Sequence, residues 1–292
     1  MGASELNDAA TGLLRDWVLG RLDAPQRTWL NLQIAELASS ASDSALHIAF
    51  GLVPRRLGKA DLALSEADRA AANRALPGWD PQGWSVADGA RILLLSHVSS
   101  TAPNFSQLFR SLCATGDAVE LTALYRGLPL YAQGQTLLDQ VGEGLRSNMR
   151  GVFEAIIHRN PYPRLHFDQH RWNHMVLKAL FVGSPLAPIF GLDERADAEL
   201  ARMLCDFAQE RHAAGRPVPF EIWRCVGSFA KGPMLDSLAR ALSSADATER
   251  SAAALALSTC PDRGAARLLA SVPTLQQGIS QGELSWATLH AA

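Results

Sequence analysis

Residues 158–183 read HRNPYPRLHFDQHRWNHMVLKALFVG, a stretch in which a rigid turn leads into a long helix. Pro161 and Pro163 each fix their own φ near about −65°, remove a backbone donor, and disfavour the helical conformation at the preceding residue. We therefore expect an extended, stiff connector that holds the side chains of Asn160 and Tyr162 in fixed directions. This connector is the first place to look for a functional site.

A long amphipathic helix follows the connector. Asp168 is a suitable N-cap, because its carboxylate can accept hydrogen bonds from the first backbone N–H groups of a helix. Gly183 is a natural stop, since glycine readily adopts the left-handed conformation that ends many helices. Between them, one side of the helix is apolar at helical spacing and is expected to face the core. Its residues are Trp172, Met175, Val176, Ala179 and Leu180.

Almost every other segment of the chain also has helical spacing, which predicts an all-α protein. Three pairs resemble capping boxes, in which two side chains satisfy the free N–H groups at a helix start. These pairs are Ser65 with Asp68, Ser85 with Asp88, and Asp246 with Glu249. Only the apolar run from Ile92 to Leu95 reads equally well as a strand. Short helices in succession favour antiparallel pairs stacked into a HEAT-like α-solenoid.

The order of these patterns divides the chain into four parts. Residues 1–76 are an N-terminal helical segment, and residues 77–89 are a loop rich in Trp, Pro and Gly that begins PGWDPQGW. Residues 90–270 are the HEAT-like array, which contains the connector. Residues 271–292 are a polar tail that we expect to dock weakly or to fray.

Composition limits the classes of partner. The chain has 27 Lys and Arg against 29 Asp and Glu, a net charge of −2, so it lacks the basic excess that a general nucleic-acid binder needs. Its acidic N-terminus has no export signal, which favours a cytoplasmic protein. The longest apolar runs are far shorter than the roughly 20 residues that span a bilayer, so we expect no direct membrane insertion.

The cysteines and histidines give weak signals for chemistry. Four widely spaced cysteines, without a Cys-x-x-Cys pair, are typical of reduced, buried thiols. They are Cys113, Cys205, Cys225 and Cys260. His170 and His174 lie four apart, the spacing at which a helix presents two metal ligands. Arg171 and Lys178 on the same helix disfavour a divalent cation, so we favour a solvated or partly packed histidine face and expect no metal or other cofactor.

A polar-ligand site is the stronger hypothesis. Arg171, His174 and Lys178 form a cationic strip, and the helix N-terminus beside Asn160 and Tyr162 adds a partial positive charge. A phosphate or carboxylate could bind there, whereas ordinary surface charges are the simpler alternative.

A second pair of residues could line the same groove from a neighbouring helix. Trp223 and Arg224 follow a Pro-rich break, and an Arg beside a Trp can stack on or fork onto an anion. Such a neighbouring pair is more often structural.

Common catalytic motifs are missing from the sequence. It contains no Gly-x-Ser-x-Gly, no Gly-x-x-x-x-Gly-Lys-Ser/Thr and no Gly-x-Gly-x-x-Gly after a strand. We therefore assign no catalytic residue. An enzyme whose site assembles from scattered residues stays open as an alternative.

Three segments together resemble the EboA family of bacterial proteins, most specifically over about residues 140–230. They read EGLRSNMRGVFEAI at 143–156, NPYPRLHFDQHRWNHMVLKALFVGSPL at 160–186, and IFGLDERADAELARMLCDFAQERHAAGRPVPFEIWRCVG at 189–227. The resemblance implies a gene cluster that moves secondary-metabolite precursors from cytoplasm to periplasm. It implies as partners other Ebo-cluster proteins, among them a prenyltransferase-like membrane protein.

The resemblance carries over only to positions within the matching segments. They are Asn160, Pro161, Tyr162, Pro163, Trp172, Asn173, Lys178, Arg202, Trp223 and Arg224. His170 and His174 do not belong to the family pattern, which further weakens the metal hypothesis. With His158 added from the connector and the two prolines left out, the candidate ligand-binding residues are His158, Asn160, Tyr162, Trp172, Asn173, Lys178, Arg202, Trp223 and Arg224.

Three functions follow from these patterns. The first is a non-catalytic protein that binds a hydrophobic metabolite precursor or a partner protein in a groove beside the connector. The second is an enzyme that modifies such a precursor, with His158, Tyr162 or Lys178 as acid or base. The third is an assembly scaffold without a small-molecule site.

Overall fold

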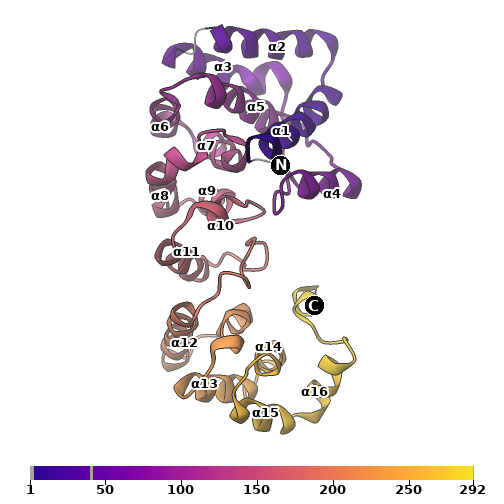
Figure 1. The fold of residues 1–292 in the computed structure, drawn as a ribbon, viewed down its shortest axis with the longest axis vertical. Helices are drawn as coiled ribbons and strands as arrows, with labels where there is room; N and C mark the ends of the chain where they lie inside the picture. Colours follow the sequence, from indigo (N-terminus) through magenta and orange to yellow (C-terminus); the bar gives the residue numbers. More distant parts are fainter. Residues whose placement is uncertain (1–2, 40–41, 292) are drawn as a thin grey trace. The chain divides into compact units, whose positions relative to one another are not determined.

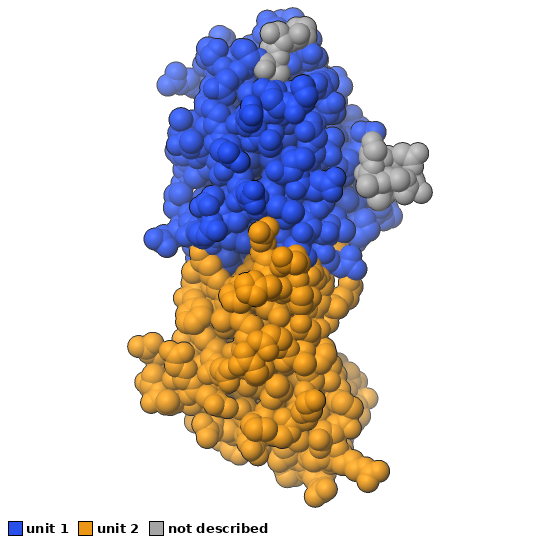
Figure 2. Space-filling model, turned by 60° about the vertical axis from the view of Figure 1, so that its left-hand side comes forward, with its two compact units in different colours: residues 1–167 blue, residues 168–292 orange. Residues whose placement is uncertain are grey.

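The computed structural model describes residues 3–39 and 42–291, and its regular structure in these ranges is helical throughout. Within them, an isolated antiparallel bridge joins Asp61 and Ser85, and no strand forms. The chain separates into two compact units, residues 1–167 and 168–292 (Figure 2). The all-α prediction is therefore confirmed.

The first unit contains ten α-helices and two 3₁₀-helices in its described residues. In chain order they are α1 (Ala3–Gly20), α2 (Ala24–Ser39), α3 (Asp43–Leu57), α4 (Glu66–Ala75), α5 (Val86–Thr101), α6 (Phe105–Thr115), α7 (Ala118–Arg126), η1 (Leu128–Leu130), η2 (Gly134–Leu137), α8 (Leu138–Arg146), α9 (Arg150–Ile157) and α10 (Tyr162–His166).

The second unit is also built from α-helices and 3₁₀-helices. Its helices are α11 (Gln169–Val182), α12 (Ala198–Ala213), η3 (Phe220–Cys225), η4 (Gly227–Phe229), α13 (Pro233–Leu242), α14 (Ala247–Ser258), α15 (Arg263–Ala270), α16 (Pro273–Ser280) and α17 (Trp286–Ala291). The predicted polar tail is thus largely helical, and both α16 and α17 pack on α14.

The helix starts follow the capping signals of the sequence. Ser65 and Ser85 each form a reciprocal capping box with Asp68 and Asp88, at the starts of α4 and α5. Asp168 caps α11 by accepting a hydrogen bond from the backbone N–H of Arg171 at 2.7 Å. These bonds satisfy N–H groups that a helix cannot satisfy internally.

The third predicted capping box is only half formed. Asp246 caps α14 by accepting a hydrogen bond from the N–H of Thr248 at 2.8 Å. Glu249 is buried instead and lies 3.6 Å from His212 of α12. Its carboxylate therefore links two helices, and no reciprocal bond to Asp246 forms in the described residues.

Helix α5 is the centre of the first unit. It contacts α1, α2, α3 and α7 (Figure 1), and thirteen of its sixteen residues are buried. A helix that is apolar on all sides is stable only when neighbours cover it on all sides. The run from Ile92 to Leu95, which reads equally well as a strand, is helical here because it lies inside this covered helix.

The loop of residues 77–84 packs into the same unit. Trp79 is fully buried, and its ring lies 5.9 Å from that of Trp17 in α1 and 6.1 Å from that of Trp84. Trp17 donates a hydrogen bond to Asp68 of the α4 capping box at 3.0 Å. This aromatic cluster holds the loop against α1 and α4.

The Ala-rich helix α14 plays the central role in the second unit. It contacts α13, α15, α16, α17 and both 3₁₀-helices. Gly227 marks the closest approach, because a Cβ on it would press on the carbonyl oxygen of Ala256 and lie 2.8 Å from the Cα of that residue. The sequence therefore needs glycine there to let η4 reach the backbone of α14.

We predict that Gly227→Ala lowers the free energy of unfolding by about 2–3 kcal/mol, because rigid backbone would have to move. The matched control is Gly278→Ala inside α16, where the nearest atom to an added Cβ is 3.6 Å away. There we expect a change between zero and a gain of about 1 kcal/mol, because alanine favours helix over glycine. Urea denaturation followed by circular dichroism measures both variants, and equal effects would contradict the close approach.

Candidate functional site

Asn160 is the anchor of the connector. Its side-chain amide is buried and donates hydrogen bonds to the carbonyl oxygens of Tyr125 at 3.1 Å and of Ala155 at 3.0 Å. Its Oδ1 accepts a hydrogen bond from the backbone N–H of Tyr162 at 3.0 Å. One side chain therefore ties together the ends of α7 and α9 and the start of α10.

The prediction of an extended connector is wrong at Tyr162, which begins the short helix α10. Asn160 Oδ1 caps the Tyr162 N–H, and Pro161 adopts φ −75° and ψ −9°, so the chain turns directly into a helix. The Tyr162 side chain is fully buried, and its hydroxyl donates a hydrogen bond to the Gly134 carbonyl at 2.9 Å. The tyrosine therefore braces α10 against η2.

Arg159 holds an unusual backbone conformation beside this anchor. Its φ is +51°, a left-handed value that costs a non-glycine residue about 1 kcal/mol or more. Two contacts with the 77–84 loop hold it: its carbonyl accepts the N–H of Asp80 at 3.2 Å, and its guanidinium lies 3.6 Å from the Asp80 carboxylate. Asp80 is itself held by Arg69 through two hydrogen bonds, of 3.0 and 2.8 Å.

A small polar pocket lies beside these residues, with a volume of about 170 Å³. We call it the connector pocket. His158, Arg159 and Asn160 line it from the connector, Asp80 lines it from the loop, and Arg126 and Glu154 line it from α7 and α9.

Ion pairs fix the charges in the connector pocket. Arg126 pairs with Asp88 at 3.0 Å, and Glu154 pairs with Arg150 at 2.7 Å. Together with the Arg69–Asp80 pair, they give the pocket a rigid, nearly balanced polar wall. Such a wall suits recognition of a small polar group better than capture of a highly charged one.

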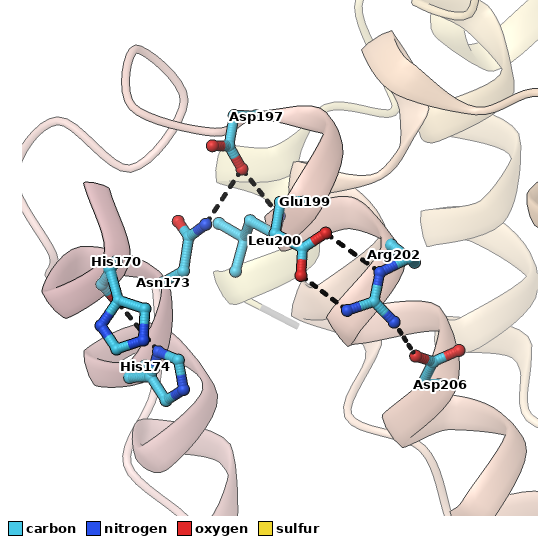
Figure 3. A network of polar contacts seen from close by, with 8 residues as sticks. All are labelled: His170, Asn173, His174, Asp197, Glu199, Leu200, Arg202 and Asp206. Carbon is cyan, nitrogen blue, oxygen red and sulfur yellow. Dashed lines mark hydrogen bonds and ion pairs between the residues drawn. The ribbon is translucent and has the colours of Figure 1, made fainter.

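The other candidate residues belong to the second unit, where Asn173 has a structural partner. In α11, Asn173 donates a hydrogen bond to Asp197 at 3.1 Å, and the same Asp197 oxygen accepts the N–H of Leu200 at 2.7 Å (Figure 3). Asn173 thus orients the N-cap of α12. Trp172 is fully buried, and the Arg195 guanidinium lies over its ring, 4.8 Å from the centroid.

Arg202 lies on an exposed face of α12. It forms ion pairs with Glu199 and Asp206, each at 2.6 Å, one turn away in either direction (Figure 3). Its pKa is raised by the hydrogen bonds with Glu199. The contacts are those of a surface helix pair, which contributes little to stability.

Trp223, Arg224 and Lys178 complete the predicted set. Trp223 is fully buried in η3, whereas the guanidinium of Arg224 forms two hydrogen bonds of 2.6 Å with the Asp193 carboxylate. Partial burial lowers the pKa of Lys178 in α11. Arg224 is thus already engaged by an acidic side chain of its own unit.

The two histidines of α11 stack on each other. Their ring centroids are 4.1 Å apart, and His174 Nδ1 lies 2.9 Å from the backbone carbonyl of His170, to which it can donate (Figure 3). Within residues 3–39 and 42–291, no three or more His, Cys, Asp or Glu side chains come together as metal ligands.

Three of the four cysteine thiols, those of Cys113, Cys205 and Cys225, are poor nucleophiles at neutral pH. Burial raises the pKa of Cys205 to about 11 and that of both Cys113 and Cys225 to about 12. All four cysteines are free; Cys205 and Cys225 are buried, whereas Cys113 and Cys260 are partly buried. A thiolate at three of these positions is therefore disfavoured.

Sequence reasoning missed a second pocket of the first unit, of about 340 Å³, between α1, α2 and the second half of α5. Ser96 and His97 of α5 line it. A signal for them exists in the sequence, since this polar pair interrupts the apolar run of a helix that is otherwise buried. The interruption becomes meaningful only once the burial of α5 is known.

The described helices thus define an all-helical protein with preformed pockets in its first unit, among them the two described above. A family model described as metabolite traffic protein EboA matches residues 10–227, so the chain belongs to the EboA family. This confirms the resemblance carried by the NPYP segment, and the family's description fits a role in metabolite traffic. No curated protein and no solved structure matches the chain.

In the part of the chain that the structure describes, no helix combines the length and the apolar character that crossing a bilayer requires.

We predict that Asn160→Ala lowers the free energy of unfolding by about 2–3 kcal/mol, because it leaves two buried carbonyls and one N–H without their partner. Asn104→Ala is the matched control: this asparagine is exposed and forms no capping bond at the start of α6. We expect the control to change stability by less than about 0.5 kcal/mol. Urea denaturation measures both, and a harmless Asn160→Ala would return Asn160 to the ligand-binding candidates.

Proposed function

We propose that the protein is a non-catalytic member of a metabolite trafficking system, which binds a precursor or a partner protein for transfer from cytoplasm to periplasm. The observation that carries the proposal is the state of Tyr162. This predicted acid or base is fully buried, and its hydroxyl donates to the Gly134 carbonyl. A group so committed supports the fold rather than proton transfer to a substrate.

A HEAT-like array of helix pairs is part of the proposal. Neighbouring helices that pack on each other, such as α8 with α9 and α13 with α14, support it. The covering of α5 by four helices departs from simple pairwise stacking. Stacked pairs would offer an extended concave surface, which suits binding of a partner.

The family resemblance supplies the proposed surroundings. We place the protein in the cytoplasm, with other Ebo-cluster proteins as partners, among them the prenyltransferase-like membrane protein. An assembly scaffold without a small-molecule site is the third hypothesis. The pocket lined by Ser96 and His97, of about 340 Å³, supports small-molecule binding over it.

One observation favours the enzyme alternative. Partial burial lowers the pKa of Lys178, and a lowered pKa increases the fraction of unprotonated amine, the form that acts as a base or nucleophile. Lys178 is therefore the residue through which an enzyme that modifies the precursor would be recognised.

The experiment that tests the proposal is retention of a small molecule. The full chain is mixed with a metabolite extract of the producing bacterium, passed through a desalting column, and its bound molecules are identified by mass spectrometry. We expect one compound to be retained with its mass unchanged after prolonged incubation.

Two other results would contradict the proposal. A product of altered mass that accumulates with time, and that is lost in Lys178→Met, would establish the enzyme. If the protein retains no compound but binds a purified Ebo-cluster protein stoichiometrically, the assembly-scaffold hypothesis is supported instead.

A further inference from the structure

The second pocket of the first unit is lined by one face of each of two helices. Residues 93, 96, 97 and 100 of α5 recur at the spacing of a single helix face, as do residues 7, 8, 11 and 15 of α1. The pocket has a volume of about 340 Å³, near the lower end of known ligand sites. We call it the α1–α5 pocket.

Two buried polar groups in this pocket lack partners. Ser96 is only 7% exposed, and neither its hydroxyl nor the buried Nε2 of His97 has a hydrogen-bond partner within the described residues. Neighbouring serines of the same helix behave differently, since Ser99 and Ser100 donate to the carbonyls of Ser96 and His97 at 2.7 and 2.8 Å. Buried polar groups are nearly always paired, so this pair calls for a partner from outside the chain.

The wall that faces α5 is held in place before any ligand binds. Ser99 accepts a hydrogen bond from the N–H of Ala132 at 3.0 Å. The side-chain amide of Gln133 donates to the carbonyls of Ser99 at 2.7 Å and Ala102 at 3.0 Å. These bonds fix Leu130 and Ala132 against the end of α5, so binding would not have to order this wall.

The remaining lining defines the chemistry of a ligand. Ile34, Leu93 and Leu130 supply apolar surface. Asp8 and Arg15 supply opposite charges, and Arg15 already donates to Asn31 at 3.3 Å. With no net charge from these two residues, the pocket favours a neutral molecule over an anion or a cation.

We propose that the α1–α5 pocket binds a neutral, mostly apolar molecule through a hydroxyl group that contacts Ser96 and His97. A hydroxyl both donates and accepts, so it pairs with a serine hydroxyl and with either tautomer of an imidazole. The apolar body of the molecule lies on Ile34, Leu93 and Leu130. This inference rests on the proposed metabolite-binding function and names its site and ligand class.

The test uses three probes of nearly the same shape: 2-naphthol, naphthalene and 2-naphthoate. Ligand-observed NMR measures the Kd of each for the full chain. We expect 2-naphthol to bind about tenfold more tightly than the other two, because only it satisfies both groups without adding charge. Ser96→Ala should weaken 2-naphthol about tenfold and leave naphthalene unchanged.

Ser258→Ala is the matched control, because this helical serine lies in the second unit and already donates to the Leu255 carbonyl at 2.7 Å. It should leave all three affinities unchanged. His97→Phe is the second variant; it keeps the pocket apolar and should also abolish the preference for 2-naphthol. Equal affinities for 2-naphthol and naphthalene, tighter binding of 2-naphthoate, or no effect of either variant would overturn the proposal.

The two proposals fail in different ways. If the wild type and Ser96→Ala retain a natural compound equally, the proposal for the α1–α5 pocket is wrong but the proposed binding function still stands. A compound that is retained but converted to a new mass would overturn the non-catalytic function while the probe preferences still report on the pocket. If Ser96→Ala no longer retains the compound while its free energy of unfolding is unchanged, the result supports both proposals.

Discussion

Burial of α5, in which thirteen of sixteen residues are buried, is the constraint on which the first unit depends. Four neighbouring helices cover most of α5, so its buried polar groups need partners within the protein. Arg91 meets this demand through the Phe50 carbonyl and Glu120, and Asp88 meets it through Ser85 and Arg126. Within α5, Ser96 and His97 are the exceptions, and both line a pocket in which a ligand can supply the missing partner.

The connector obeys the same constraint and resolves it internally. Buried Asn160 pairs with backbone groups of three helices, and buried Tyr162 pairs with a fourth element. The fixed orientation of these two side chains first suggested a ligand site. Their hydrogen bonds to these four elements explain the fixed orientation instead. Family membership and a structural role are compatible here, since a family can share a fold-defining turn as readily as a ligand site.

Local patterns predicted the helices well, because caps and spacing act within a few residues. Ser65, Ser85 and Asp168 illustrate this, as does the left-handed Gly183. What the sequence could not supply was the environment of each side chain. Whether Asn173 meets a ligand or caps α12 through Asp197 depends on residues 24 positions away. The same holds for Ser96, whose importance follows only from packing by α1 and α2.

The central claim is that the protein holds an unmodified molecule in the α1–α5 pocket, while the connector supports the fold. A crystal structure of the full chain with its retained natural compound tests this most directly. We predict an unaltered ligand between α1 and α5, with a hydroxyl in hydrogen-bond contact with Ser96 Oγ. A ligand in the connector pocket beside His158, or one chemically altered near Lys178, would contradict the account.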